Sequence, residues 1–230
     1  MRHFDLNRLG TALAVAVAGF VALPHPAEAG CKDRPAPGVN WTKCSKERLV
    51  FSGRNMNKAV FKNAYLSGTS FRGSDLRNSN FEGAELSRCS FNGAKLQSAK
   101  FSRAYGSRIR FIRANISNGK LSKAELQRSN FSLANLKNAN LSNGDFFRSV
   151  FDGANLTGAN LRRANISRVS FRGAKLANVN LRQTYMYRAR FEGVDLSTVS
   201  GLTQQQLATA CIDANTKLPK GLHASTKTAC

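Results

Sequence analysis

Large apolar residues recur at every fifth position along most of this chain. From Phe51 to Leu196, every fifth residue is apolar except Gly106. Within this series phenylalanine returns every 20 residues, at Phe51, Phe71, Phe91, Phe111, Phe131, Phe151, Phe171 and Phe191. Neither the period of an α-helix nor that of a β-strand produces such spacing. A fixed non-helical period predicts a repeat architecture in which each repeat packs on its neighbours.

Each five-residue unit also has a small residue two positions before the large one. Alanine is the most common residue there, and Leu49, Arg54 and Ile109 depart from the rule. The other positions are mostly polar, so we expect each unit to send one large and one small side chain inward. No proline occurs between Pro37 and Pro219, which leaves every backbone N–H of the repeats available to a β ladder.

Glycine recurs two residues after most of the column phenylalanines, at Gly53, Gly73, Gly93, Gly153, Gly173 and Gly193. A glycine at one fixed turn position predicts positive φ, as at the third residue of a type II turn. Arg113 and Leu133 interrupt the series. We therefore expect the turn type to change in the middle of the repeats.

The repeated pattern Ala-Asn/Asp-Leu-x-x, as in Ala134-Asn135-Leu136 and Ala159-Asn160-Leu161, resembles the pentapeptide-repeat family. The resemblance implies an all-β fold, a right-handed quadrilateral β-helix with four pentapeptides in each coil. Such a solenoid would explain the 20-residue spacing, because each coil returns to the same face and stacks the phenylalanines along one edge of the core.

The first 29 residues have the features of a cleavable signal peptide. Arg2 and Arg8 give a basic start, an apolar run follows at residues 9–23, and residues 27–29 read Ala-Glu-Ala. This order predicts cleavage after Ala29 and a periplasmic or secreted protein. The alternative is an uncleaved anchor, although the apolar run is short for a membrane-spanning helix.

Two non-repeating segments flank the predicted repeats of residues 49–200. Residues 30–48 form an N-terminal capping segment, with Trp41 as a lid over the open end of the core. Residues 201–230 form a C-terminal capping helix and tail. Thr203 and Gln206 match a capping box, and Leu202 and Leu207 a hydrophobic staple, which predicts a helix over about 204–211. Such caps protect the open ends of a β solenoid.

Five cysteines in an exported chain indicate disulfides. Cys31 and Cys44 precede the rod, whereas Cys211 and Cys230 follow it. Because a disulfide needs Cα atoms within about 7 Å, bonds between the two ends are excluded. We predict Cys31–Cys44 and Cys211–Cys230, with Cys89 as a buried free thiol in the small inward column.

The sequence offers little for catalysis. His223 is the only histidine after the signal peptide, and no serine or cysteine is linked to it by a motif. No spacing typical of a zinc site or a phosphate-binding loop occurs. We therefore expect no enzymatic activity, no metal and no cofactor.

The distinctive outward feature is a second 20-residue series, made of arginines. It comprises Arg88, Arg108, Arg128, Arg148, Arg168 and Arg188, and aromatic residues lie nearby at Tyr105, Phe147, Tyr185 and Tyr187. Arginines interleaved with aromatic rings suit phosphate, sulfate or carboxylate polymers. The alternative is a ladder neutralised within the protein, in which Glu85, Glu125 and Asp145 pair with the arginines.

The charge balance narrows the choice of function. The chain has 35 Lys and Arg against 13 Asp and Glu, a formal net charge of +22, which attracts polyanions. We expect a monomeric, exported scaffold that binds an anionic envelope polymer, lipid head groups or an acidic protein. The alternative implied by the resemblance is a DNA-mimicking gyrase or topoisomerase regulator, which the positive charge and the export signal disfavour. Specific binding of nucleic acid is not expected.

Overall fold

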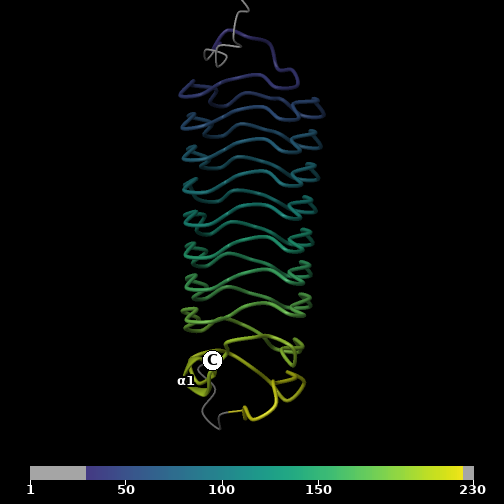
Figure 1. Ribbon diagram of the computed structural model, residues 1–230, viewed down its shortest axis with the longest axis vertical. Helices are drawn as coiled ribbons and strands as arrows, with labels where there is room; N and C mark the ends of the chain where they lie inside the picture. The colour runs from purple at the N-terminus through teal and green to yellow at the C-terminus, as the bar shows by residue number, and fades with distance from the viewer. Residues whose placement is uncertain (1–29, 225–230) are drawn as a thin grey trace, which may run out of the picture.

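The computed structural model describes residues 30–224 as a rod of stacked coils (Figure 1), with the N-terminal coil at one end and the short helix at the other. Its shape is the right-handed quadrilateral β-helix expected from the repeats. Residues 20 apart pair in parallel, from Asn40↔Val60 to Asn180↔Ser200. These contacts are single bridges rather than longer strands, and the helix within the described range is α1, Gln204–Leu207.

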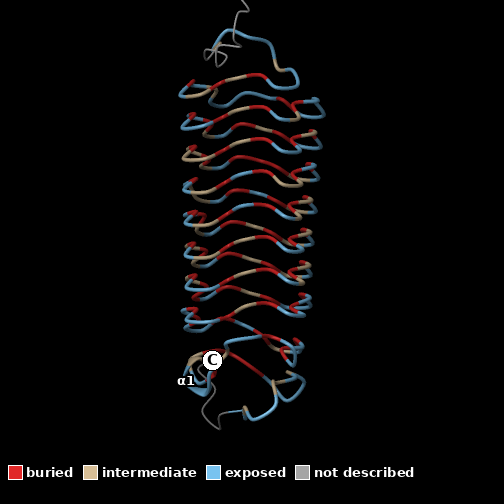
Figure 2. Ribbon diagram, in the orientation of Figure 1, coloured by how far each residue is buried: buried red, intermediate tan, exposed pale blue. Residues whose placement is uncertain are grey.

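Two sets of backbone hydrogen bonds build every coil. Between successive units, the small residue closes a β-turn onto the large residue three positions before it, as when Ala134 N–H donates to Phe131 O over 3.0 Å. Between coils, Phe111 N–H donates to Asn130 O over 2.7 Å, and Asn130 N–H donates to Ile109 O over 2.8 Å. Buried and exposed positions therefore alternate along each coil (Figure 2).

The third residue of the turn has positive φ at almost every unit. Gly93 has φ 65°, as expected for the glycine series. The expectation that Arg113 and Leu133 change the turn type is wrong, because their φ values are 57° and 59°. The hydrogen bonds to neighbouring coils hold the backbone in this conformation, so the turn is kept even where the residue disfavours it.

The phenylalanine column is confirmed as the stacked edge of the core. Phe71 and Phe91 stack at 5.1 Å between ring centroids, and Phe111 and Phe131 at 4.7 Å. The column meets a second one, formed by Trp41, Phe61, Phe81 and Phe101. The phenylalanines of the two columns make edge-to-face contacts, and Trp41 meets Phe51 in a tilted contact. We did not anticipate this second column, although the same 20-residue spacing in the sequence carries it.

The N-terminal segment is more regular than the separate cap we expected over residues 30–48. The parallel ladder already begins at Asn40, and Trp41 is fully buried against Phe51 and Phe61. The Lys46 ammonium lies 4.4 Å from the Trp41 ring centroid and covers this end of the core. The predicted Cys31–Cys44 disulfide is present, with Cα atoms 5.5 Å apart.

The C-terminal helix is shorter than the predicted 204–211. Its capping box between Thr203 and Gln206 is present, and Leu207 is buried. The helix ends early because Cys211 returns to the ladder and pairs with Arg190, a separation of 21 residues instead of 20. Cys211 is disulfide-bonded, and its predicted partner Cys230 lies outside the described residues.

Candidate anion-binding corner

The predicted arginine series occupies one corner of the rod. Each arginine is the third residue of a turn, with φ between 53° for Arg128 and 60° for Arg88. Its backbone N–H is fixed by the next coil, as when Arg128 N–H donates to Phe147 O over 2.8 Å. Neighbouring arginines are therefore one coil apart, roughly 4.8 Å along the rod, and all are exposed.

The column extends further toward the N-terminus than the sequence pattern suggested. Arg48 has φ 56° and Gly68 has φ 73°, so both occupy the same turn position in the two preceding coils. We call the column of Arg48, Gly68, Arg88, Arg108, Arg128, Arg148, Arg168 and Arg188 the arginine corner. Arg48 was missed because the repeats were expected to begin at Leu49, although its 20-residue spacing places it in the series.

Two of the acidic residues beside this corner, Asp145 and Glu85, bond to other neighbours. The Gln127 side-chain amide donates to Asp145 Oδ2 over 2.8 Å, and the Asn165 amide donates to Asp145 Oδ1 over 3.0 Å. The Glu85 carboxylate accepts from the Ser67 hydroxyl. Among residues 30–224, the ion pairs involve Arg77, Arg103, Arg190 and Lys217, and none involves Arg88, Arg108, Arg128, Arg148 or Arg168.

Aromatic side chains accompany the C-terminal part of the corner. The Arg148 guanidinium carbon lies 5.0 Å from the Phe147 ring centroid, and that of Arg188 lies 6.0 Å from the Tyr187 centroid. Tyr105 and Tyr185 occupy ladder positions on the same face and are 43% and 62% exposed. Partial burial raises the pKa of Tyr105, and the nearby Glu85 and Tyr65 raise it further by smaller amounts. This phenol therefore stays neutral at physiological pH.

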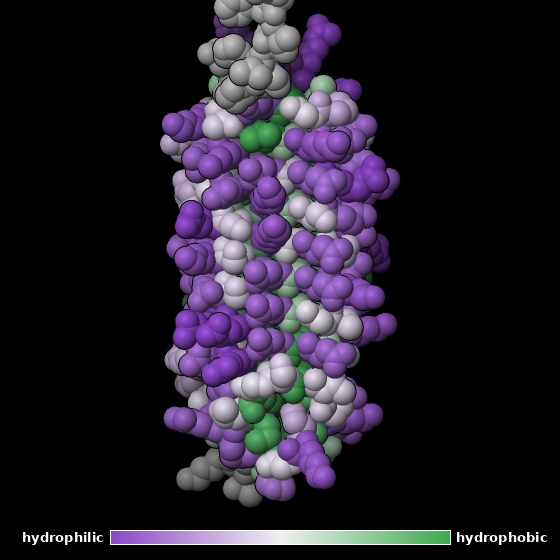
Figure 3. Space-filling view, viewed as in Figure 1, coloured by the Kyte–Doolittle hydropathy of each residue, from purple (hydrophilic) through white to green (hydrophobic). Residues whose placement is uncertain are grey.

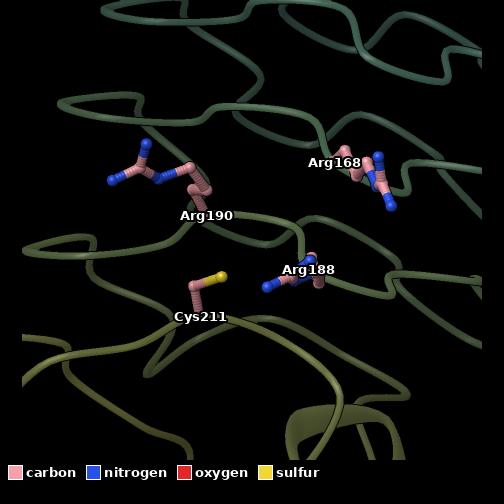
Figure 4. Close-up of a pocket in the computed structure, with 4 residues that line it drawn as sticks. All are labelled: Arg168, Arg188, Arg190 and Cys211. Atoms are coloured by element: carbon pink, nitrogen blue, oxygen red, sulfur yellow. The ribbon is translucent and has the colours of Figure 1, made fainter. Parts of the chain in front are cut away.

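Two open pockets lie at the two ends of the arginine corner. The N-terminal one, about 300 Å³, is lined by Arg48, Ser67, Gly68, Ser87, Arg88 and Ser107. The C-terminal one, about 340 Å³, is lined by Arg168, Arg188, Arg190 and Cys211 (Figure 4). In that pocket the Arg190 side chain is directed away from Arg168 and donates to Glu192 over 3.0 Å.

The rest of the described surface is mainly polar. Figure 3 shows hydrophilic side chains along the length of the visible face, with hydrophobic ones gathered near the C-terminal end. Residues 30–224 contain no group of His, Cys, Asp or Glu placed to hold a metal ion. No helix in this range is long and apolar enough to cross a membrane.

Cys89 is the free cysteine of the described chain, and it is buried as predicted. Its thiol donates to Leu66 O over 2.9 Å. Burial raises the pKa of Cys89 to about 12, so the reactive thiolate is essentially absent at neutral pH. This residue therefore belongs to the core rather than to a chemical site.

Solved structures with the same repeat resemble the rod. The regulator of heterocyst differentiation HetL, a pentapeptide repeat protein from the cyanobacterium Nostoc, is 22% identical, with 81% of this chain and 92% of that one covered and a TM-score of 0.42. Full-length QnrB1, a plasmid-mediated fluoroquinolone resistance protein, is 15% identical, with 79% and 91% covered and a TM-score of 0.42. A thylakoid-lumen pentapeptide repeat protein of Arabidopsis thaliana is 25% identical, with 49% and 68% covered and a TM-score of 0.23.

Family profiles match most of the repeat region. The profile described as a pentapeptide repeat region matches residues 84–161, and that described as pentapeptide repeats (8 copies) matches residues 55–93 and 164–200. No curated protein matches the sequence. Together with the stacked five-residue turns, these matches show that the chain belongs to the pentapeptide-repeat family.

Proposed function

We propose that this protein is an exported, non-enzymatic scaffold of the cell envelope that binds an anionic polymer along its arginine corner. The arginines form a straight, exposed row parallel to the rod axis. A linear polyanion lying along the rod can contact several of them at once, and each such contact releases counterions and adds to the affinity. Guanidinium groups suit phosphate, sulfate and carboxylate because they donate two parallel hydrogen bonds.

The observation that carries this proposal is the choice of arginine at a left-handed turn position. Glycine adopts positive φ freely, whereas other L-residues there cost roughly 1 kcal/mol or more each. The corner contains seven arginines in that conformation, and stacked like charges add repulsion. Arg88, Arg108, Arg128, Arg148 and Arg168 form no ion pair among residues 30–224. A polyanion would offset both costs.

The general charge of the rod supports the same partner class. Residues 51–200 contain 25 Lys and Arg against 8 Asp and Glu, a net charge of +17 (25 − 8). A DNA-mimicking regulator of gyrase would require a negative rod. The predicted signal peptide would bring the protein outside the cytoplasm, which supports an envelope partner over gyrase. Among envelope partners, the linear row of arginines favours a polymer over lipid head groups or a single acidic protein.

The experiment compares two variants that lose the same charge from the same kind of turn. In the first, Arg108, Arg128, Arg148 and Arg168 are changed to glycine. In the matched control, glycine replaces Arg103, Arg113, Lys123 and Arg163, which also have positive φ but lie on other corners. Both proteins are eluted from a heparin column with salt, and their affinity for heparin is measured at several salt concentrations.

We expect the first variant to elute at much lower salt. The slope of log affinity against log salt should fall by about 3, since each lost phosphate-like contact removes roughly 0.7–0.9. For the control variant, the same slope should fall by about 1 or less. Equal losses would show that the charge acts diffusely and would reject the arginine corner as the binding site. A pulldown from envelope extract that yields one acidic protein would contradict the proposal that the partner is a polymer.

Export is tested separately from binding. The full chain is expressed with its native N-terminus in a bacterial host, and the periplasmic fraction is collected. Sequencing of the purified protein should begin at Gly30, as the predicted cleavage after Ala29 requires. Retention of the uncleaved chain in the cytoplasm would contradict this part of the proposal.

A further inference from the structure

We propose that the N-terminal end of the arginine corner contains a discrete site for a tetrahedral oxyanion, the phosphate or sulfate group of an ester or the free ion. We call this site the notch, formed by Arg48, Ser67, Gly68, Ser87, Arg88 and Ser107. The inference rests on the proposed function, because it assigns a specific ligand group to one end of the same column.

The notch exists because one side chain is missing from the arginine corner. Gly68 occupies the turn position between Arg48 and Arg88, and its φ of 73° places it in the same conformation as they have. A Cβ atom added there would lie 3.3 Å from Arg48 Cγ, so any larger side chain would enter the space beside Arg48. The resulting hollow of about 300 Å³ lies at the lower limit of ordinary ligand pockets.

The two arginines flank the gap from opposite sides. Arg48 and Arg88 are two coils apart, on the order of 10 Å along the rod from a rise of about 4.8 Å per coil. Their long side chains can reach a common point over Gly68, where each guanidinium can donate to a different pair of anion oxygens. Consecutive arginines elsewhere in the corner are too close for an anion to sit between them at the backbone.

Serine hydroxyls supply neutral donors at the floor of the notch. Ser67, Ser87 and Ser107 occupy the second turn position in three successive coils. Ser67 already donates to Glu85, whereas the hydroxyls of Ser87 and Ser107 have no hydrogen-bond partner within residues 30–224. The preceding coil carries Glu47 in this column, and the later coils carry Gln127, Phe147, Ser167 and Tyr187. Within residues 30–224, three successive serines beside a gap therefore occur only at this end.

A second departure from the repeat helps to shape the site. Gly106 stands where every other unit from Phe51 to Leu196 has a large core residue, and its φ is 147°. A Cβ atom added there would lie 2.6 Å from Ser87 N and 2.9 Å from the Leu86 carbonyl carbon. At this φ a Cβ atom would point at the preceding coil, so the position requires glycine. Ser107, the next residue, lines the edge of the notch, where its carbonyl oxygen accepts from Arg88 N–H over 2.9 Å.

One acidic group near the notch has its own hydrogen bonds. The Glu85 carboxylate accepts from the Ser67 hydroxyl and from Ser87 N–H, the latter over 3.2 Å. Ser67 and Ser87 line the pocket whereas Glu85 does not, so the carboxylate borders the notch and engages the Ser67 hydroxyl without occupying the hollow. The C-terminal pocket is a weaker candidate, because Arg190 is paired with Glu192 and Arg188 has partners of its own.

The test fills the notch while adding positive charge. Gly68→Arg completes the arginine corner in a backbone conformation that Arg88 already adopts. Binding of inorganic phosphate and inorganic sulfate to the folded full chain is measured by calorimetry at low salt. We expect Gly68→Arg to weaken phosphate binding by about tenfold or more although the net charge rises by one, because the space and the paired donors are lost.

Two further variants control for charge and for folding. Gly173→Arg adds the same charge at a glycine with φ 64° and nothing within 4 Å of an added Cβ, and it should leave phosphate binding unchanged or slightly tighter. Arg88→Gly introduces no backbone strain and should weaken binding about tenfold through the lost guanidinium contacts. Phosphate binding by Gly68→Arg that equals or exceeds that of the unmodified protein would overturn the proposal.

A short polyphosphate chain, titrated in parallel, identifies the source of the oxyanion. If the notch holds the end group of a polymer, Gly68→Arg weakens both polyphosphate and phosphate; if it holds the free ion, only phosphate is affected. Both outcomes support the notch. The variant with glycine at positions 108, 128, 148 and 168 retains Arg48 and Arg88 and should keep phosphate binding, so failure of the proposed function can be distinguished from failure of this inference.

Discussion

The arginine corner and the glycine corner use the same turn with opposite side-chain choices. By the glycine corner we mean the residues two positions after the column phenylalanines, which are glycine except at Arg113 and Leu133. Gly173 has φ 64° and Arg168 has φ 57°, so the backbones are nearly alike. The turn requires only a left-handed residue, and glycine meets that need at least cost. The fold therefore does not explain why arginine, rather than glycine, recurs at the arginine corner.

The core residues beneath the two corners also differ, being uniform under the glycine corner and varied under the arginine corner. Turns at the glycine corner begin at the continuous phenylalanine column. Turns at the arginine corner begin at a mixed series, namely Lys46, Leu66, Leu86, Gly106, Leu126, Phe146, Ile166 and Met186. One face thus provides regular packing, whereas the other combines an irregular core with an organised exterior. Under the proposed function, stability and binding therefore depend on different faces of one rod.

The largest effect is expected from the core beneath the glycine corner. Phe111 is fully buried and stacks on Phe91 at 5.0 Å and on Phe131 at 4.7 Å. Phe111→Ala should lower the free energy of unfolding by about 3–5 kcal/mol, because it removes apolar burial and leaves a cavity. The midpoint of chemical unfolding measures this loss. A midpoint close to that of Arg128→Gly would contradict the assignment of stability to this column.

A smaller but position-dependent effect is expected at two glycines. Gly106→Ala would place Cβ 2.6 Å from Ser87 N, so the backbone of a neighbouring coil must move. Gly93 has φ 65° and nothing within 4 Å of an added Cβ. Gly93→Ala therefore carries only the cost of placing a non-glycine residue at positive φ. We expect losses of about 3 and about 1 kcal/mol respectively in thermal unfolding. Equal losses would show that the close contact between an added Cβ at position 106 and the neighbouring coil does not lower stability.

Exchanging residues between corners tests the comparison directly. Arg128→Gly should stabilise the rod by about 1 kcal/mol, since glycine tolerates φ near 53° and one stacked charge is removed. Gly93→Arg should destabilise it by a similar amount. Chemical unfolding at low salt measures both. Destabilisation by Arg128→Gly would mean that the arginine column supports the fold and needs no ligand to explain it.

The smallest effect is expected where an arginine rests on an aromatic ring. Arg148 lies 5.0 Å from the Phe147 centroid, and Phe147→Ser gives this coil the residue found at Ser167. We expect a loss of about 0.5–1 kcal/mol, as is usual for an exposed cation–π contact. Tyr187→Ser, where the distance is 6.0 Å, should cost no more. A larger loss at Tyr187 would contradict the distance dependence.

Much of the fold could be predicted because the repeat is local and strict. The apolar spacing fixed the coil length and the inward positions, and the capping box at Thr203 and Gln206 gave the start of the helix. The predicted end of the helix was wrong, because the actual end depends on Cys211 pairing with Arg190 across coils. The turns at Arg113 and Leu133 were also mispredicted, since hydrogen bonds from adjacent coils outweigh the preference of a single residue.

The candidate site was only partly predictable. The 20-residue spacing identified six arginines, but Arg48 and the gap at Gly68 were missed because the repeats were expected to begin at Leu49 and Gly68 interrupts the series of arginines. The sequence also left open whether Glu85, Glu125 and Asp145 neutralise the column. For Glu85 and Asp145 the side-chain geometry decided this point, since these carboxylates bond to Ser67, Gln127 or Asn165 instead.

The sequence alone determined the period, the inward and outward faces and the excess of positive charge, because these depend on spacing and composition within each unit. Only the tertiary structure decided which charges meet and where a hollow forms. Those outcomes depend on residues 20 or more positions apart, brought together by the stacking of coils. The notch is the clearest case, because it arises where Gly68 lies between Arg48 and Arg88 in space.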